Sequence, residues 1–141
     1  MNRLFLVCIF AVSLAGCSNK EEANLLEILT AGYADDPDIK DLKLEPSEMA
    51  ECVVDKISGE IPGIPGDPRR DPYFKAYISL SVTPTSKEQI LANFRQAEEA
   101  LGSKQAVYEA RESIGAFVVD CMENLEKNVF AKEDEQLEEG A

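Results

Sequence analysis

The sequence predicts an all-α protein, a small bundle of about five helices that ends in a disordered acidic tail. Apolar residues recur every three or four positions over five segments, which is the spacing of one face of a helix. Capping residues, prolines and glycines stand where those helices would begin and end. Alternation with period two, the pattern of a half-buried strand, is confined to one short run at residues 78–82.

The first predicted helix begins at a capping box, in which Ser18 is the cap and Glu21 follows three residues later. Its apolar stripe consists of Leu25, Leu26, Ile28 and Leu29. The helix is expected to end near Gly32. The segment 34–44 that follows is polar and interrupted by proline, so we expect a loop with a short turn.

Pro46 suits the first position of a second helix, and Glu48 in its first turn complements the helix dipole. The apolar face of this helix comprises Met49, Cys52, Val53 and Ile57. Prolines and glycines alternate over 61–68, which predicts a rigid connector between helices. The alternative for this connector is a recognition segment in the polyproline conformation.

Asp71 and Pro72 open a third helix as cap and first residue, and we expect it to cover residues 72–82. Its second half, Ile78-Ser79-Leu80-Ser81-Val82, alternates like a strand. A single short strand would have no evident partner in this chain, and therefore we favour helix.

Two overlapping capping boxes begin a fourth helix, Thr85 with Glu88 and Ser86 with Gln89. The stripe predicted to be buried consists of Ile90, Leu91, Phe94, Ala97 and Leu101. Gly102 fits the stop of this helix.

Ser103 fits the cap of the fifth and longest helix. Its core-facing residues recur every three or four positions: Val107, Ala110, Ile114, Phe117, Val118, Cys121, Leu125 and Val129. The segment 131–141 carries five acids and one lysine without an apolar period, so we expect a disordered tail. The helical domain is therefore expected to span residues 17–130.

The N-terminus has the three parts of an export signal. Met1-Asn2-Arg3 carries one positive charge, residues 4–12 are apolar, and small residues follow. The apolar run is shorter than the roughly 20 residues of a membrane-spanning helix. The tetrapeptide Leu14-Ala15-Gly16-Cys17 resembles the lipobox of bacterial lipoproteins, and this resemblance covers residues 1–17 alone.

The resemblance implies that residues 1–16 are removed as a signal peptide and that the thiol of Cys17 carries lipid. Two or more acyl chains hold a protein firmly to a membrane, whereas one binds marginally. Ser18 after the cysteine resembles the class sorted to the periplasmic face of the outer membrane rather than to the inner membrane. The alternative is an ordinary secretory signal with an incidental cysteine.

The cysteine count then favours one bridge between helices. The chain has four cysteines, of which Cys8 would leave with the signal and Cys17 would be acylated. An exported chain meets an oxidising compartment, so Cys52 and Cys121 are expected to form a disulfide. Both lie on core-facing stripes. Two free thiols are the alternative.

Charge and composition exclude several classes of function. The formal charge of −13 becomes −14 when the predicted signal, with Arg3 and no acid, is removed. A general nucleic-acid binder needs clusters of Lys and Arg, so we expect no nucleic-acid partner. The chain has no histidine, which removes the commonest general base and neutral metal ligand.

Two local clusters invite a functional interpretation. Asp35, Asp36, Asp38 and Asp41 form a weak candidate for a cation-binding loop. The EF-hand spacing fails there, and a solvated turn is the favoured interpretation. Arg69, Arg70, Tyr73, Phe74 and Tyr77 form an aromatic and basic cluster. Tyr and Arg anchor interfaces, which makes this cluster a candidate docking surface. The favoured interpretation places Phe74 and Tyr77 in the core and leaves both arginines solvated in a loop.

We therefore expect a non-enzymatic, lipid-anchored protein of the cell envelope whose helical domain binds a partner protein, as an accessory to envelope assembly or secretion. We expect no cofactor. The membrane would be contacted through the acyl chains on Cys17. A small-molecule or cation-binding lipoprotein is the alternative, and a hydrolase with paired carboxylates is a third hypothesis.

Overall fold

The computed structural model describes residues 19–139, with side chains up to Ala131. Within this range the chain forms six α-helices, one 3₁₀ turn and no strand, which confirms the predicted all-α class. The elements are α1 (Lys20–Ala34), α2 (Pro37–Asp41), α3 (Pro46–Glu60), η1 (Pro68–Arg70), α4 (Asp71–Ser81), α5 (Lys87–Leu101) and α6 (Lys104–Glu139).

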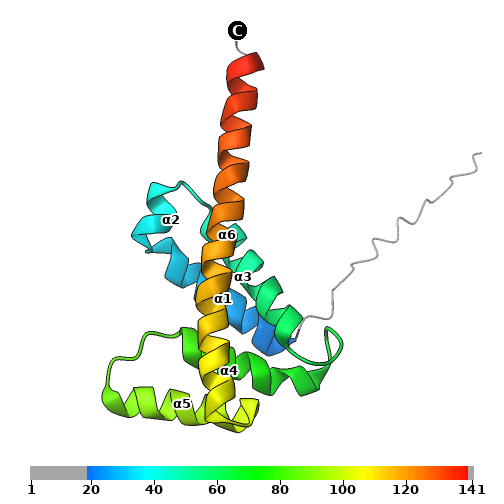
Figure 1. The fold of residues 1–141 in the computed structure, drawn as a ribbon, viewed down its shortest axis with the longest axis vertical. Helices are drawn as coiled ribbons and strands as arrows, with labels where there is room; N and C mark the ends of the chain where they lie inside the picture. The colour runs from blue at the N-terminus through cyan, green and yellow to red at the C-terminus, as the bar shows by residue number, and fades with distance from the viewer. Residues whose placement is uncertain (1–18, 140–141) are drawn as a thin grey trace, which may run out of the picture.

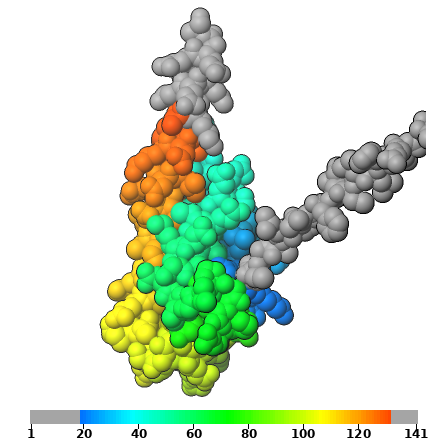
Figure 2. Space-filling model, turned by 90° about the vertical axis from the view of Figure 1, so that its right-hand side faces the viewer, coloured from blue at the N-terminus to red at the C-terminus, as the bar shows by residue number. Residues whose placement is uncertain are grey.

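The long helix α6 is the axis of the molecule (Figure 1). Helix α3 packs on α6 and on α1, and α1 in turn packs on α4. Helices α4 and α5 pack on each other and lie across the lower end of α6. Seen from the side, α6 runs along one side of the body that it forms with the other helices (Figure 2). Every other helix is therefore held, directly or through a neighbour, to α6.

The main core lies where α1, α3, α4 and α6 meet. Its fully buried side chains include Leu25, Met49, Val53, Ile57, Phe74 and Cys121. A second, smaller cluster joins α4, α5 and the start of α6 through Ala76, Ala97 and Val107. Burying a large apolar side chain stabilises a fold by about 1.5–3 kcal/mol, so most of the stabilisation comes from the main core.

A disulfide joins Cys52 of α3 to Cys121 of α6, as predicted. The two Cα atoms are 5.9 Å apart, within the range that a disulfide spans. One turn away on α3, the Lys56 ammonium contacts the Asp120 carboxylate at 2.5 Å. This hydrogen-bonded ion pair lowers the pKa of Asp120 below its usual value. Helices α3 and α6 are thus joined covalently and electrostatically at neighbouring positions.

Residues 71–81 are helical, so the alternating run at 78–82 does not form a strand. Its two serines donate hydrogen bonds to the preceding turn, Ser79 Oγ to the Lys75 carbonyl and Ser81 Oγ to the Tyr77 carbonyl. A serine hydroxyl satisfied in this way fits a helix interior. The polar positions that made the sequence resemble a strand are therefore compatible with α4.

The predicted helix ends are largely confirmed. Ser86 Oγ accepts the Gln89 N–H at the start of α5, and Ser103 Oγ accepts the Ala106 N–H at the start of α6. Gly102 ends α5 in the left-handed region, with φ +88°. Ser18 lies outside the described residues, and the residue that precedes α1 is Asn19.

Three boundaries differ from those predicted. Asp71, predicted to cap the third helix, is the first residue of α4, and Arg70 precedes it. Residues 37–41, predicted as part of a loop, form the short helix α2, because Asp36 caps it and Pro37 suits its first position. Helix α6 continues to Glu139, past the predicted boundary at Ala131. The segment from Ala131 to Glu139 contains neither glycine nor proline and is rich in good helix formers, so the backbone continues the helix without a break.

Candidate partner-binding surfaces

The predicted docking cluster is not one surface. Arg70 is 2% exposed, and Phe74 and Tyr77 are buried in the main core. Tyr73 is half-buried, and Arg69 is exposed beside Asp67. The prediction of a docking surface is therefore wrong for Arg70, Phe74 and Tyr77. Helix α4 directs Phe74 and Tyr77 into the core, and Arg70, the last residue of η1, is directed toward Ser58.

Arg70 instead donates hydrogen bonds to the C-terminal turn of α3. Its guanidinium lies 5.3 Å from the centre of the Phe74 ring. Nη2 donates hydrogen bonds to the backbone carbonyl and to the hydroxyl of Ser58, while Nε and Nη1 are buried without a partner in the described structure. The last carbonyls of a helix lack partners within it, and a cation there is favourable. The contacts of Arg70 with Ser58 and Phe74 thus join the end of α3 to α4.

The aspartate loop does not form a metal site. The Asp36 carboxylate accepts the N–H groups of Asp38 and Ile39 as the cap of α2. Asp35 is almost fully exposed and lies 3.7 Å from the Lys40 ammonium. Within the described range, no group of three or more Asp, Glu, Cys or His side chains is placed to hold a metal ion. Asp36 therefore caps α2, and Asp35 forms an ion pair with Lys40.

The apolar stripe of helix α5 is more exposed than the sequence predicts. Of the stripe predicted to be buried, Ala97 is buried, but Ile90 is 48% exposed and Leu91 is 57% exposed. The reason is tertiary: α5 packs on α4 and on the start of α6, and no other described helix covers its outer side. The first half of α5 therefore presents apolar side chains at the surface.

A groove of about 500 Å³ lies between α5 and the first turns of α6. Its residues are Ile90, Leu91, Phe94, Arg95, Glu98, Lys104, Tyr108 and Arg111. The rings of Phe94 and Tyr108 meet edge to face, with centroids 5.3 Å apart, and join its two walls. A smaller hollow against the end of α4 shares Ile90, Phe94 and Arg111 with it. We call the groove of these eight residues the α5–α6 groove.

The charge of the α5–α6 groove is opposite to that of the chain. Three cations, Arg95, Lys104 and Arg111, line it with one carboxylate, Glu98, although the chain carries −13 overall. Lys104 is the first residue of α6, whose first turn contains no acid. A cation at a helix N-terminus opposes the helix dipole, so helix stability does not explain it. Departures of this kind from local preference occur at functional sites.

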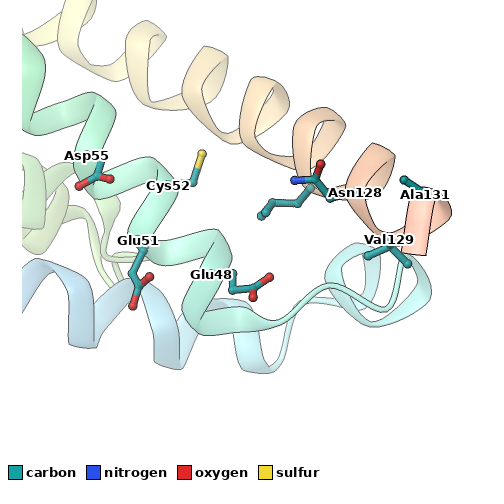
Figure 3. Close-up of a pocket in the computed structure, with 8 residues that line it drawn as sticks. Glu48, Glu51, Cys52, Asp55, Asn128, Val129 and Ala131 are labelled. Atoms are coloured by element: carbon teal, nitrogen blue, oxygen red, sulfur yellow. The ribbon is translucent and has the colours of Figure 1, made fainter. Parts of the chain in front are cut away.

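A second groove of about 500 Å³, between α3 and the upper part of α6, has the opposite character (Figure 3). Glu48, Glu51 and Asp55 line it from α3, and Asn128, Val129 and Ala131 from α6. Figure 3 shows the three carboxylates spread along α3 rather than converging on one point. The groove is thus an acidic surface beside the disulfide, and it lacks a closely paired set of carboxylates.

No helix within residues 19–139 combines the length and apolarity needed to cross a membrane. Cys17, the predicted lipidation site, lies outside the described residues. Searches of protein-family models, curated proteins and solved structures return no match to this chain.

Proposed function

We propose that this chain is a lipid-anchored protein of the bacterial cell envelope, and that its α5–α6 groove binds an acidic, amphipathic segment of another envelope protein. The N-terminal signal with Cys17 supports the anchor. The observation that carries the binding role is the α5–α6 groove, which combines apolar and aromatic side chains with three cations and one carboxylate on a strongly acidic chain.

The chemistry of the groove suits a helical segment with apolar residues on one face and acids at its edges. Ile90, Leu91 and Phe94 recur at helical spacing and offer aliphatic and aromatic contact to apolar residues of a partner. Arg95 and Arg111 can pair with carboxylates at the edges of that partner. The net charge of the rest of the chain repels acidic segments elsewhere and so favours binding in this groove.

Photo-crosslinking in intact cells tests the partner directly. A photoreactive residue at Leu91 is expected to capture an envelope protein through an acidic segment. The same residue at Val119, which has similar exposure on α6 but lies outside the groove, is the matched control and should not capture it. Equal capture from both positions would contradict the assignment of the groove.

Charge reversal in the purified complex then tests the chemistry. Arg111→Glu should weaken the complex by at least about tenfold, because it places a carboxylate against the acidic partner. Lys127→Glu, the same change at an exposed position of α6 away from the groove, should leave affinity within about twofold. A partner that binds both variants equally would rule out recognition by charge in the groove.

The anchor is tested by Cys17→Ser. This variant should leave the membrane fraction, because it lacks the thiol that accepts lipid. Retention of Cys17→Ser in membranes would contradict the anchor without affecting the test of the groove.

A further inference from the structure

Hydrogen bonds of Asn19 join the start of α1 to the connector between α3 and α4. The Asn19 side chain, 5% exposed, donates hydrogen bonds to the Asp67 carbonyl (2.6 Å) and to the Asp71 carboxylate (2.9 Å). Its amide oxygen accepts the Gly66 N–H at 2.9 Å. Figure 1 shows this connector, in green, beside the first turn of α1, in blue. The chain therefore enters the domain at a fixed point on the connector.

The tip of the connector presents an exposed aliphatic side chain on a rigid turn. The Asp67 N–H donates to the Ile64 carbonyl at 3.0 Å, with Pro65 second in the turn and Gly66 third, at φ +85°. Proline and a positive-φ glycine at these positions are typical of a type II turn. Ile64 is 74% exposed, the highest value among the exposed large apolar residues of the described structure.

The surroundings of Ile64 suit contact with lipid. Residues 61–66 contain no charged residue. At the base of the connector the Arg69 guanidinium lies 2.5 Å from the Asp67 carboxylate, and nearby the Lys75 ammonium lies 3.7 Å from the Glu21 carboxylate. Arg69 holds the pKa of Asp67 down to about 2, so the pair stays ionised and mutually compensated. Residues 61–66 therefore form an uncharged segment between the charged residues Glu60 and Asp67.

Only two residue steps separate Cys17 from Asn19. A fully extended chain covers at most about 7 Å in two residues. The Cα atom of Cys17, which is proposed to carry the acyl chains, can therefore lie no more than about 7 Å from the Cα atom of Asn19, whose side chain is hydrogen-bonded to Gly66 and Asp67. The tip of the connector would meet the same stretch of membrane.

We propose that the tip at residues 61–66 inserts Ile64 into the headgroup boundary of the bilayer, as a second contact beside the lipid on Cys17. This inference rests on the anchor of the proposed function. Two contacts held together by Asn19 orient the domain on the membrane, whereas a single flexible tether would leave it free to turn. The α5–α6 groove, made by other elements at the lower end of α6, remains available to a partner.

The chain contains no tryptophan, so Ile64→Trp introduces a single fluorescent reporter at the tip. The full lipidated protein is purified and bound to vesicles of phosphatidylethanolamine with a minor share of phosphatidylglycerol, with and without brominated acyl chains. We expect a blue shift of the emission on binding and strong quenching by the brominated lipid. Leu91→Trp, in the α5–α6 groove, is the matched control and should show neither change.

Mass spectrometry of the same samples separates the two ways in which this experiment can fail. If Cys17 is acylated and the Ile64→Trp variant binds vesicles, yet its tryptophan is not quenched, the insertion is overturned and the anchor stands. If Cys17 carries no lipid, the anchor is overturned and the insertion with it. Equal quenching of the tryptophans in both variants would overturn the proposed orientation. Self-association that shifts the emission of the tip reporter without quenching would overturn the insertion and assign the tip to a second copy of the chain.

Discussion

The middle and the first turns of helix α6 differ in how completely their apolar neighbours are buried. Its middle, around Cys121, belongs with α1, α3 and α4 to the main core, which we call the disulfide core, where apolar side chains are buried from four helices and a covalent bond joins two of them. Its first turns belong with α5 to a region that we call the α5 side, where Ala97 and Val107 are buried but much of the apolar stripe is exposed. The comparison indicates that buried apolar packing is concentrated in the disulfide core, whereas the α5 side keeps apolar side chains at the surface.

The difference has a physical cause. The core-facing residues of α1, α3, α4 and α6 are buried or partly buried against one another. Helix α5 packs on α4 and α6, but Ile90 and Leu91 remain exposed beside these contacts. Within the described residues, no helix packs on the outer face of α5. A region with few buried contacts opens at lower free energy than the rest of a fold. A partner that covers the α5–α6 groove would therefore stabilise the α5 side more than the disulfide core.

The largest expected effect comes from removing the disulfide. Cys52→Ala with Cys121→Ala should lower the free energy of unfolding by about 4 kcal/mol, because the bridge closes a loop of 69 residues in the unfolded chain. Urea unfolding of the variant and the oxidised wild type measures this. A loss below about 1 kcal/mol would show that the disulfide core does not depend on its bridge.

A pair of truncations compares the two regions directly. Met49→Ala removes a fully buried side chain from the disulfide core and should cost about 3 kcal/mol. Leu91→Ala removes an exposed side chain from the α5 side and should change the free energy of unfolding by no more than about 0.5 kcal/mol. Similar costs for the two variants, measured by urea unfolding, would contradict the comparison.

A smaller effect is expected at the start of α5. Ser86→Ala removes the hydroxyl that accepts the Gln89 N–H and should cost about 1 kcal/mol. If the α5 side opens independently of the disulfide core, amide hydrogen exchange in Ser86→Ala should be faster than in the wild type only in the first turns of α5. Ser47→Ala, an exposed serine in the first turn of α3, is the control and should leave exchange in α5 unchanged. Accelerated exchange throughout the disulfide core would show that the two regions unfold together.

The last prediction concerns alkaline pH in the disulfide core. Burial, helped by the nearby charge of Asp36, raises the pKa of Tyr33 from 10.0 to about 12. The folded state therefore favours the neutral phenol, and this contribution to stability is complete below pH 10 and is lost as the pH rises toward 12. Burial also raises the pKa of Tyr77, which adds a loss of the same sign.

Tyr33→Phe should therefore lose less stability than the wild type between pH 10 and 12. Urea unfolding at the two ends of this range measures the difference, and tyrosinate absorbance reports the titration itself. An identical loss in both proteins would show that Tyr33 ionises as readily in the folded state as in the unfolded chain.

Local signals in the sequence predicted most of the secondary structure. The caps at Ser86 and Ser103 and the stop at Gly102 act within four residues of themselves, so they can be recognised without a fold. The signal for α2, Asp36 followed by Pro37, was also present, but the surrounding polar residues favoured a loop. The pairing of Cys52 with Cys121 followed from counting cysteines together with the predicted export.

The candidate site was harder to predict, because it depends on which faces remain uncovered. The period of α5 correctly grouped Ile90, Leu91 and Phe94 on one face but could not show that this face lacks a covering helix. The basic and aromatic cluster at residues 69–77 does not form one surface: Phe74 and Tyr77 are in the core, as the favoured interpretation held, but Arg70 is buried where that interpretation left it solvated. Nothing in the local sequence of Arg70 shows that Ser58, twelve residues away, accepts its hydrogen bonds.

The sequence by itself determined the all-α class, most helix boundaries and the residues that share each helix face. These properties depend on backbone hydrogen bonds and side-chain spacing over three or four residues. The tertiary structure alone decided that the face of α5 stays open, that Arg70 is buried and that Asn19 holds the connector. These properties depend on contacts between elements far apart in the chain, which local spacing does not encode.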